Sequence, residues 1–173
     1  MIEEPKIKLV SNFIGNSNQL FDRIKNSVVW DERMRSRKTA SYGVAYNYSG
    51  MTYSAVDMLD ALIPLCDRIK KQIGFLPNNC LLNYYADGNS TMGYHSDKIS
   101  ELKAGTGVAI ISLGAARYIY YRNKRDRASE YKYLLNSGDL LYMNDEIQQQ
   151  WLHAIPKQLE AGERISLTFR HIL

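Results

Sequence analysis

From Cys80 onward, the chain is a series of short apolar runs separated by turn residues, and this feature constrains the fold most. The runs are rich in Leu, Ile, Val and Tyr, and turn signals such as Asp87-Gly88 and Asn136-Ser137-Gly138 divide them. This pattern predicts strands near 80–85, 108–113, 117–122, 131–135, 139–143, 151–155 and 164–171.

The N-terminal half has helical rather than strand periodicity. Residues 18–26 form a short amphipathic pattern, and 57–73 form a stronger one that Gly74 ends. Pro64 predicts a kink or a restart within the second helix. Helices followed by many short strands predict an α+β fold, with a double-stranded β-helix (jelly-roll) core braced by N-terminal helices on one face.

The length of 173 residues predicts one domain covering 1–173. The first ten residues are charged and lack a signal-peptide core, and no apolar run approaches the ~20 residues of a membrane span. Cys66 and Cys80 form no CxxC pair and lie in apolar contexts. We therefore expect buried free thiols, a reducing compartment, a cytoplasmic location and no membrane contact, and nothing implies an obligate protein partner.

Positive charge gathers in two short runs, although the net charge is only +4. Each run has two interpretations of about equal weight: phosphate contacts to a nucleic acid, or solvated loops. Thirteen tyrosines suit surfaces that are partly apolar and partly wet, including surfaces that stack on bases. The runs are Arg33, Arg35, Arg37 and Lys38, and Arg122, Lys124, Arg125 and Arg127.

His95 and Asp97 are two residues apart, so in extended backbone their side chains point the same way. The chain has three histidines, and His153 lies on a predicted strand while His171 is two residues from the C-terminus. Two imidazoles, one carboxylate and no thiolate match the facial triad of non-haem iron(II) oxygenases. A surface histidine beside an unrelated aspartate is the alternative for the His95–Asp97 pair alone.

The segment 164–170 alternates polar and apolar residues and predicts a half-buried strand. Arg164, Ser166, Thr168 and Arg170 then share one face, and two inward arginines need an anion because an unpaired buried charge is costly. A short dicarboxylate could bridge them. The alternative is a polar face that meets water. Before the His95–Asp97 pair, Asn83 and Tyr85 share a face and can donate hydrogen bonds to a ligand carboxylate.

Taken in order, these elements resemble the AlkB-like dioxygenases, which remove alkyl groups oxidatively from nucleic-acid bases. The resemblance runs from about Arg37 to Arg170. Its most specific part is Arg164 to Arg170, similar to the family's R-x-N-x-T-F-R. The other matching segments are 37–43, 46–50, 83–88 (N-x-Y-x-x-G), 92–98 (HxD), 111–117, 137–143 and 151–156.

The resemblance implies the cofactor Fe(II), the cosubstrates 2-oxoglutarate and O2, and alkylated DNA or RNA as the partner. It implies that His95, Asp97 and His153 bind iron. Arg170 and Asn83 would hold the C1 carboxylate end of 2-oxoglutarate, with Ser166 nearby, and Arg164 and Tyr85 would hold the C5 carboxylate. Tyr46 and Tyr48 would line the base pocket against the His95 ring, within a substrate-facing lid at 28–53 that includes Arg37 and Lys38.

Two positions depart from the family pattern. Ser166 stands where the family has Asn, which predicts a weaker or water-mediated contact to the cosubstrate. Ile99 replaces an acidic residue that recognises the base edge, and an isoleucine accepts no hydrogen bond. Within the lid, Trp30 or Met34 could wedge into a base stack, or Trp30 could be ordinary core.

Three functions therefore stand side by side. The first is iron- and 2-oxoglutarate-dependent demethylation of N-alkylated bases, as in DNA repair, which releases formaldehyde, succinate and CO2. The second keeps this chemistry but acts on a small molecule or protein side chain, which the replacement at Ile99 favours. The third is a non-catalytic nucleic-acid binder, and the complete set of metal ligands argues against it.

Overall fold

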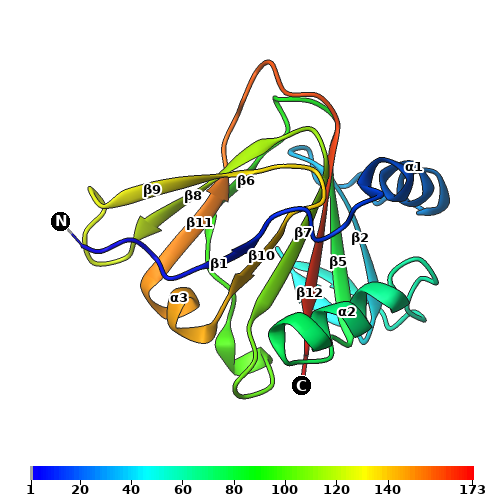
Figure 1. Ribbon diagram of the computed structural model, residues 1–173, viewed down its shortest axis with the longest axis horizontal. Helices are drawn as coiled ribbons and strands as arrows, with labels where there is room; N and C mark the ends of the chain where they lie inside the picture. Colours follow the sequence, from blue (N-terminus) through cyan, green and yellow to red (C-terminus); the bar gives the residue numbers. More distant parts are fainter. Residues whose placement is uncertain (1) are drawn as a thin grey trace.

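The computed structural model describes residues 2–173, and its centre is a pair of facing antiparallel sheets (Figure 1). The larger sheet has the order β1-β10-β7-β12-β5-β2 and the smaller one β6-β11-β8-β9. A separate hairpin joins β3 (Tyr46–Tyr48) to β4 (Met51–Tyr53). The larger sheet contains β1 (Lys8–Val10), β2 (Lys38–Gly43), β5 (Asn79–Tyr85), β7 (Val108–Gly114), β10 (Leu140–Met143) and β12 (Arg164–Arg170). The smaller contains β6 (Met92–His95), β8 (Arg117–Asn123), β9 (Glu130–Leu135) and β11 (Trp151–Ile155).

The larger sheet is buried on both faces, which gives the molecule two apolar cores. Its inner face packs against the smaller sheet through residues such as Ile110 and Ile119. Its outer face, with Leu82, Ile111 and Leu167, packs against the helices. Every residue of β5 and β12 is therefore buried, and the interpretation of 164–170 as a strand whose polar face meets water is wrong.

Helices α1 (Ser17–Ser27) and α2 (Ile63–Ile73) lie beside the larger sheet (Figure 1). Ile24 of α1 and Ile69 of α2 are fully buried in the outer core. The predicted helix at 57–73 begins only at Ile63, because Pro64 fits the first turn of a helix but not its interior. Gly74 ends it with a φ of 103°, a left-handed conformation that glycine adopts without strain.

The seven predicted strands are all present, with ends that differ from the prediction by one residue at most. The periodicity did not predict the strands β1, β2, β3, β4 and β6 or the short helix α3 (Asp145–Gln150), which have three to six residues each and show no clear period. Both cysteines are free and buried, as expected. None of the described helices is both long and apolar enough to cross a bilayer.

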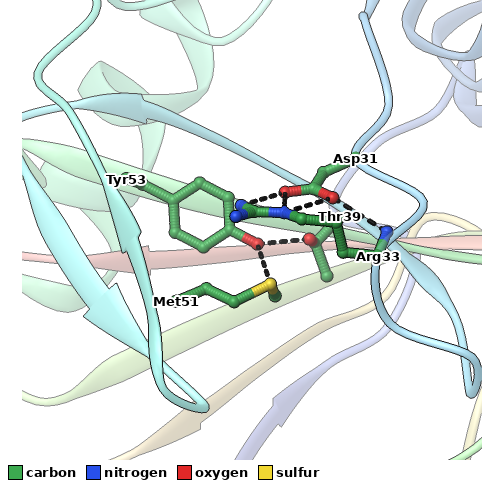
Figure 2. Close-up of polar contacts among 5 residues, drawn as sticks. All are labelled: Asp31, Arg33, Thr39, Met51 and Tyr53. Atoms are coloured by element: carbon green, nitrogen blue, oxygen red, sulfur yellow. Dashed lines mark hydrogen bonds and ion pairs between the residues drawn. The ribbon is translucent and has the colours of Figure 1, made fainter.

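The β3–β4 hairpin is fastened to the edge of the larger sheet (Figure 2). The hydroxyl of Tyr53 on β4 forms a hydrogen bond with the hydroxyl of Thr39 on β2 and contacts the sulfur of Met51. Thr39 pairs with Asn83 across the strands, so its side chain is on the inner face of the sheet. The hairpin therefore contacts the larger sheet on its inner face, which faces the smaller sheet.

Candidate metal centre and cosubstrate cavity

His95 and His153 are directly opposite each other on two hydrogen-bonded strands. They are Cα partners in the register of β6 with β11, and their ring centroids are 4.3 Å apart. Side chains opposite each other in an antiparallel pair leave the sheet on the same face. The strand pairing therefore brings together two imidazoles that are 58 positions apart in the sequence (153 − 95).

Asp97 completes the group from the loop after β6. One ligand atom from each of His95, Asp97 and His153 lies within 4.8 Å of the others. The Asp97 carboxylate forms a salt bridge with Arg170 Nε, and its backbone N–H donates to Gln148 Oε1 at 2.8 Å. Both ends of this residue are thus held without any contribution from a metal.

The protonation of the three side chains suits metal binding. Burial lowers the pKa of His153 to about 3, helped by the nearby His95, and burial also lowers the pKa of His95. Burial alone would raise the pKa of Asp97, but the charge and hydrogen bond of Arg170 outweigh it and lower that pKa. At neutral pH the site therefore offers two neutral imidazoles and a carboxylate, the ligating forms of these groups.

These residues fit an iron(II) ion. His95 Nδ1 lies 2.9 Å from the carbonyl of Gly93, a contact that orients the ring and directs Nε2 toward the site. His153 Nδ1 is buried and has no hydrogen-bond partner among the described residues. Two histidines and one carboxylate are the ligand set that leaves positions open for a cosubstrate and oxygen.

A buried cavity between the two sheets opens beside His95 and His153. Its polar lining comes mainly from β5 and β12, and apolar side chains line the remainder. The polar group comprises Asn83, Tyr85, Arg164, Ser166, Thr168 and Arg170, and the apolar group includes Leu81, Met92, Ile110, Ile119 and Ile155. All four residues that the alternation of 164–170 assigned to one face line this cavity.

Arg164 is a buried cation whose hydrogen-bonding capacity is largely unused. Its Nη2 donates to Ser112 Oγ at 2.8 Å, but Nε and Nη1 have no partner among residues 2–173. Its guanidinium lies over the ring of Tyr85, 5.0 Å from the centroid, and burial lowers its pKa. A buried guanidinium with free N–H groups is a site for an anion, and a carboxylate matches its geometry.

The other end of the cavity is also polar, and most of its polar side chains form hydrogen bonds with other residues of the protein. Asn83 Nδ2 donates to Ser166 Oγ at 3.4 Å, and Asn83 Oδ1 accepts from Arg37 Nε at 2.8 Å. Arg170 is occupied at Nε by Asp97, but its Nη1 is buried and unpaired among the described residues. The structure thus brings Asn83, Ser166 and Arg170 together next to the metal ligands.

Tyr46 and Tyr48 of the hairpin form the rim of this centre. Their rings are stacked, with centroids 6.1 Å apart, and the Tyr48 ring meets the His95 ring edge-on at 6.5 Å. Burial raises the pKa of Tyr46 to about 12, so both hydroxyls stay protonated at neutral pH. A second, more open cavity lies between the hairpin and residues 95–101 and leads to the metal ligands.

Four of the six predicted substrate-binding residues line neither cavity, and three of these four also lie away from the cavity wall. Trp30 packs against Tyr84 on the outer face of the larger sheet and donates to the carbonyl of Lys25. Lys38 lies on that same face, paired with Glu32. Ile99 is partly exposed in the 3-10 turn Ile99–Glu101 and lines neither cavity.

Arg37, by contrast, is buried beside the cavity rather than exposed for phosphate contacts. Besides Asn83, it donates to the hydroxyl of Tyr48, to Ser36 Oγ and to the carbonyl of Thr91. One guanidinium therefore connects the cavity wall with the hairpin.

Three further residues contribute to the centre and were not predicted from the sequence. Arg117 is fully buried and donates to three backbone carbonyls, including those of Ser90 and Pro156. Gln148 holds Asp97, and Glu101 lines the open cavity. Arg117 begins a strand of alternating character, so the argument used for Arg164 could have found it. Gln148 lies in the six-residue helix α3 and Glu101 in a three-residue 3-10 turn, and both elements are too short to show a clear period.

Comparisons with known proteins agree with this geometry. The family model described as the 2OG-Fe(II) oxygenase superfamily matches residues 15–170. DNA oxidative demethylase ALKBH2 of Bos taurus is 34% identical over 148 residues, 79% of this chain and 53% of its own length. Alpha-ketoglutarate-dependent dioxygenase alkB homolog 3 of Rattus norvegicus is 31% identical over 179 residues, 92% of this chain and 61% of its own length. The chain thus spans about half to three fifths of the length of these relatives.

The structure of OsALKBH1 superposes with a TM-score of 0.73 at 17% sequence identity, and the match covers 99% of this chain and 100% of that one. A match at this identity concerns the fold, which is the jelly-roll fold of this enzyme class. Because the family model covers nearly the whole chain and the relatives share about a third of its residues, the chain belongs to the 2OG-Fe(II) oxygenase superfamily and is AlkB-like within it.

Proposed function

We propose that this chain is an Fe(II)- and 2-oxoglutarate-dependent dioxygenase that removes alkyl groups from nucleic-acid bases. His95, Asp97 and His153 would hold the metal, as their charge states and mutual distances support. Bound Fe(II), together with 2-oxoglutarate and O2, supplies the oxidising chemistry that converts an N-methyl group to formaldehyde and leaves succinate and CO2. The protein binds and orients the reactants.

Cosubstrate binding is the first task of the chain. Arg164, whose Nε and Nη1 have no partner among the described residues, would receive the C5 carboxylate of 2-oxoglutarate beside the Tyr85 ring. Arg170 and Asn83 would direct the other end toward the metal ligands, with Ser166 as a further polar neighbour. The apolar lining keeps water from the reacting atoms.

The rim supports a flat, aromatic substrate, and this observation carries the proposal. Stacked Tyr46 and Tyr48 stand over the approach to His95, and base–aromatic stacking is worth ~1–3 kcal/mol per base. A base in a duplex must first leave the helix, which costs a few kcal/mol and favours damaged or single-stranded targets. The names of relatives, such as DNA oxidative demethylase, point in the same direction.

The proposed substrate-facing part of the predicted lid 28–53 is the hairpin 46–53. Its neighbours support this narrower assignment, because 38–43 is a strand of the larger sheet. We also propose that α1 and α2 brace the outer face of that sheet and so keep β5 and β12 in position. Lys98, an exposed cation that lines the open cavity, is the candidate for a phosphate contact.

The test is turnover of 2-oxoglutarate by the iron-loaded protein with and without methylated oligonucleotides. Stimulation by a methylated oligonucleotide, but not by its unmethylated counterpart, supports the proposal. The alternative, a small molecule or protein side chain as the substrate, predicts 2-oxoglutarate turnover that no oligonucleotide stimulates.

A further inference from the structure

Gln148 is a buried polar residue that the proposed chemistry does not use, and it contacts one of the metal ligands. Its side chain is 1% exposed, and its Oε1 accepts the backbone N–H of Asp97 at 2.8 Å. It comes from α3, which ends directly before β11 and its ligand His153. One short stretch of chain therefore supplies a metal ligand and also holds the backbone of another.

The orientation of the Gln148 amide follows from its neighbours. An amide oxygen must face the Asp97 N–H, because two donors cannot pair, so the amide nitrogen points to the sulfur of Met143 at 3.7 Å. A sulfur atom is a weak acceptor, and this second contact adds little. The bond to Asp97 is accordingly the one strong hydrogen bond that the buried side chain makes.

The backbone of Gln148 is held as firmly as its side chain. Lys124 Nζ donates to the Gln148 carbonyl at 2.6 Å, and Lys124 N donates to the carbonyl of Gln150 at 2.9 Å. At the start of α3, Asn144 caps the helix by accepting from Ile147 N. The amide of Gln148 is thus presented from a fixed support.

Asp97 needs such a support because it lies beyond the last residue of β6. His95 is fixed by the strand register, whereas Asp97 has no ladder hydrogen bonds. Its carboxylate is held by Arg170 and its N–H by Gln148, so the two contacts define both its position and its direction. Removing the acceptor would leave a buried N–H unpaired and free the loop to move.

We propose that Gln148 is a positioning residue that presents the Asp97 carboxylate to the metal. This inference rests on the proposed metal centre and is independent of the nucleic-acid substrate. Hydrogen-bond partners that orient metal ligands commonly contribute about 10–100-fold to metal affinity. We expect an effect of this size when the acceptor is lost.

The experiment compares metal binding by the wild-type chain and by Gln148→Met, which keeps the side-chain length but removes the acceptor. Gln149→Met is the matched control, since Gln149 is the exposed neighbour on the same helix. Gln148→Glu restores an acceptor. The readouts are Mn(II) affinity by calorimetry, the Co(II) absorption spectrum, and the melting temperature of the metal-free protein.

We expect Gln148→Met to weaken Mn(II) binding by about 10–100-fold and to alter the Co(II) spectrum. Gln149→Met should behave as wild type, and Gln148→Glu should recover part of the affinity. Wild-type affinity together with an unchanged spectrum in Gln148→Met overturns the inference. If Gln148→Met lowers the metal-free melting temperature, the same comparison is made with Gln148→Asn, whose shorter amide cannot reach Asp97. A wild-type chain that binds no metal overturns the proposed function itself.

Discussion

Arg37 Nε donates to Asn83 Oδ1 over 2.8 Å inside the protein, and this bond links the wall of the cosubstrate cavity to the rim. The same guanidinium donates to the hydroxyl of Tyr48, whose ring faces the metal ligand His95. Arg37, which belongs to a basic run in the sequence, therefore links the cosubstrate cavity to the rim through buried hydrogen bonds.

Replacing Arg37 should weaken the binding of both the cosubstrate and the nucleic acid. Arg37→Ala removes a buried cation and leaves Asn83 and Tyr48 without their donor, so we expect at least about tenfold weaker binding of both 2-oxoglutarate and oligonucleotide. Arg35→Ala, which removes an exposed arginine of the same run, is the control and should affect oligonucleotide binding only. The prediction fails if Arg37→Ala, like the control, leaves the affinity for 2-oxoglutarate intact in a calorimetric titration.

The three metal ligands make the simplest test of the centre. His95→Ala, Asp97→Ala and His153→Ala each remove one ligand from a three-ligand site, so each should abolish metal-dependent 2-oxoglutarate turnover. His171→Ala is the control, because His171 contacts the carbonyl of Leu76 instead. Full activity in any of the three variants would contradict the metal assignment.

Arg164 should dominate the affinity for 2-oxoglutarate. Arg164→Ala removes the guanidinium whose Nε and Nη1 are free, and we expect a loss of about 2–5 kcal/mol in binding, or at least thirtyfold in Kd. Arg164→Lys should restore only part of this, since an ammonium replaces a planar fork. Calorimetric titration with 2-oxoglutarate in the presence of Mn(II) gives both values; equal affinity of Arg164→Ala and wild type would exclude the assignment.

We expect Glu101 to take the role at the rim that the sequence assigned to position 99. It lines the open cavity with Tyr46 and Tyr48, and its carboxylate lies 3.8 Å from the exposed Lys98 ammonium, so we expect it to favour a positively charged methylated base. Glu101→Gln should lower the activity on 3-methylcytosine, which is cationic, by about tenfold, and hardly change that on neutral 3-methylthymine. Glu160→Gln, the same change at an exposed position, is the control. An equal loss of activity on both bases would show that Glu101 does not distinguish charged from neutral bases.

The proposed bracing of the larger sheet by α1 and α2 can be tested by measuring the free energy of unfolding. Ile69→Ala on α2 creates a cavity in the outer core and should lower the free energy of unfolding by about 2–5 kcal/mol. Ile63→Ala, the same change at an exposed position of the same helix, should cost far less. Urea denaturation of both variants makes the comparison, and equal losses would argue against a bracing role.

The sequence predicted most of the strands because their residues alternate or form compact apolar runs. The sequence also predicted which residues of 164–170 share the inward face. It left open whether this polar face meets water, and the structure excludes that alternative because every residue of β12 is buried. Periodicity could not predict where side chains point in segments outside regular strands and helices. Ile99 and Glu101 share a 3-10 turn, in which no period of two or 3.6 residues indicates the face.

Long-range contacts were the other limit. The pairing of β2 with β5 turns Lys38 toward Tyr84, whereas Arg37, just before β2, donates to Asn83 on the opposite face. Neighbouring residues of one basic run therefore have opposite environments. A local pattern does not contain this register. The residue types alone suggested that His95 and His153 converge, and the family resemblance strengthened this prediction, but the convergence itself depends on which strands pair.

We propose that this metal centre demethylates bases in nucleic acid. The most direct test of this proposal is mass spectrometry of single-stranded DNA and RNA oligonucleotides carrying 1-methyladenine or 3-methylcytosine, after incubation with the protein, Fe(II), 2-oxoglutarate and O2. We predict a loss of 14 Da per methylated base, roughly the mass of CH2, with one succinate formed per methyl group and no loss with His153→Ala. Steady 2-oxoglutarate turnover with every methylated oligonucleotide left intact would contradict the claim.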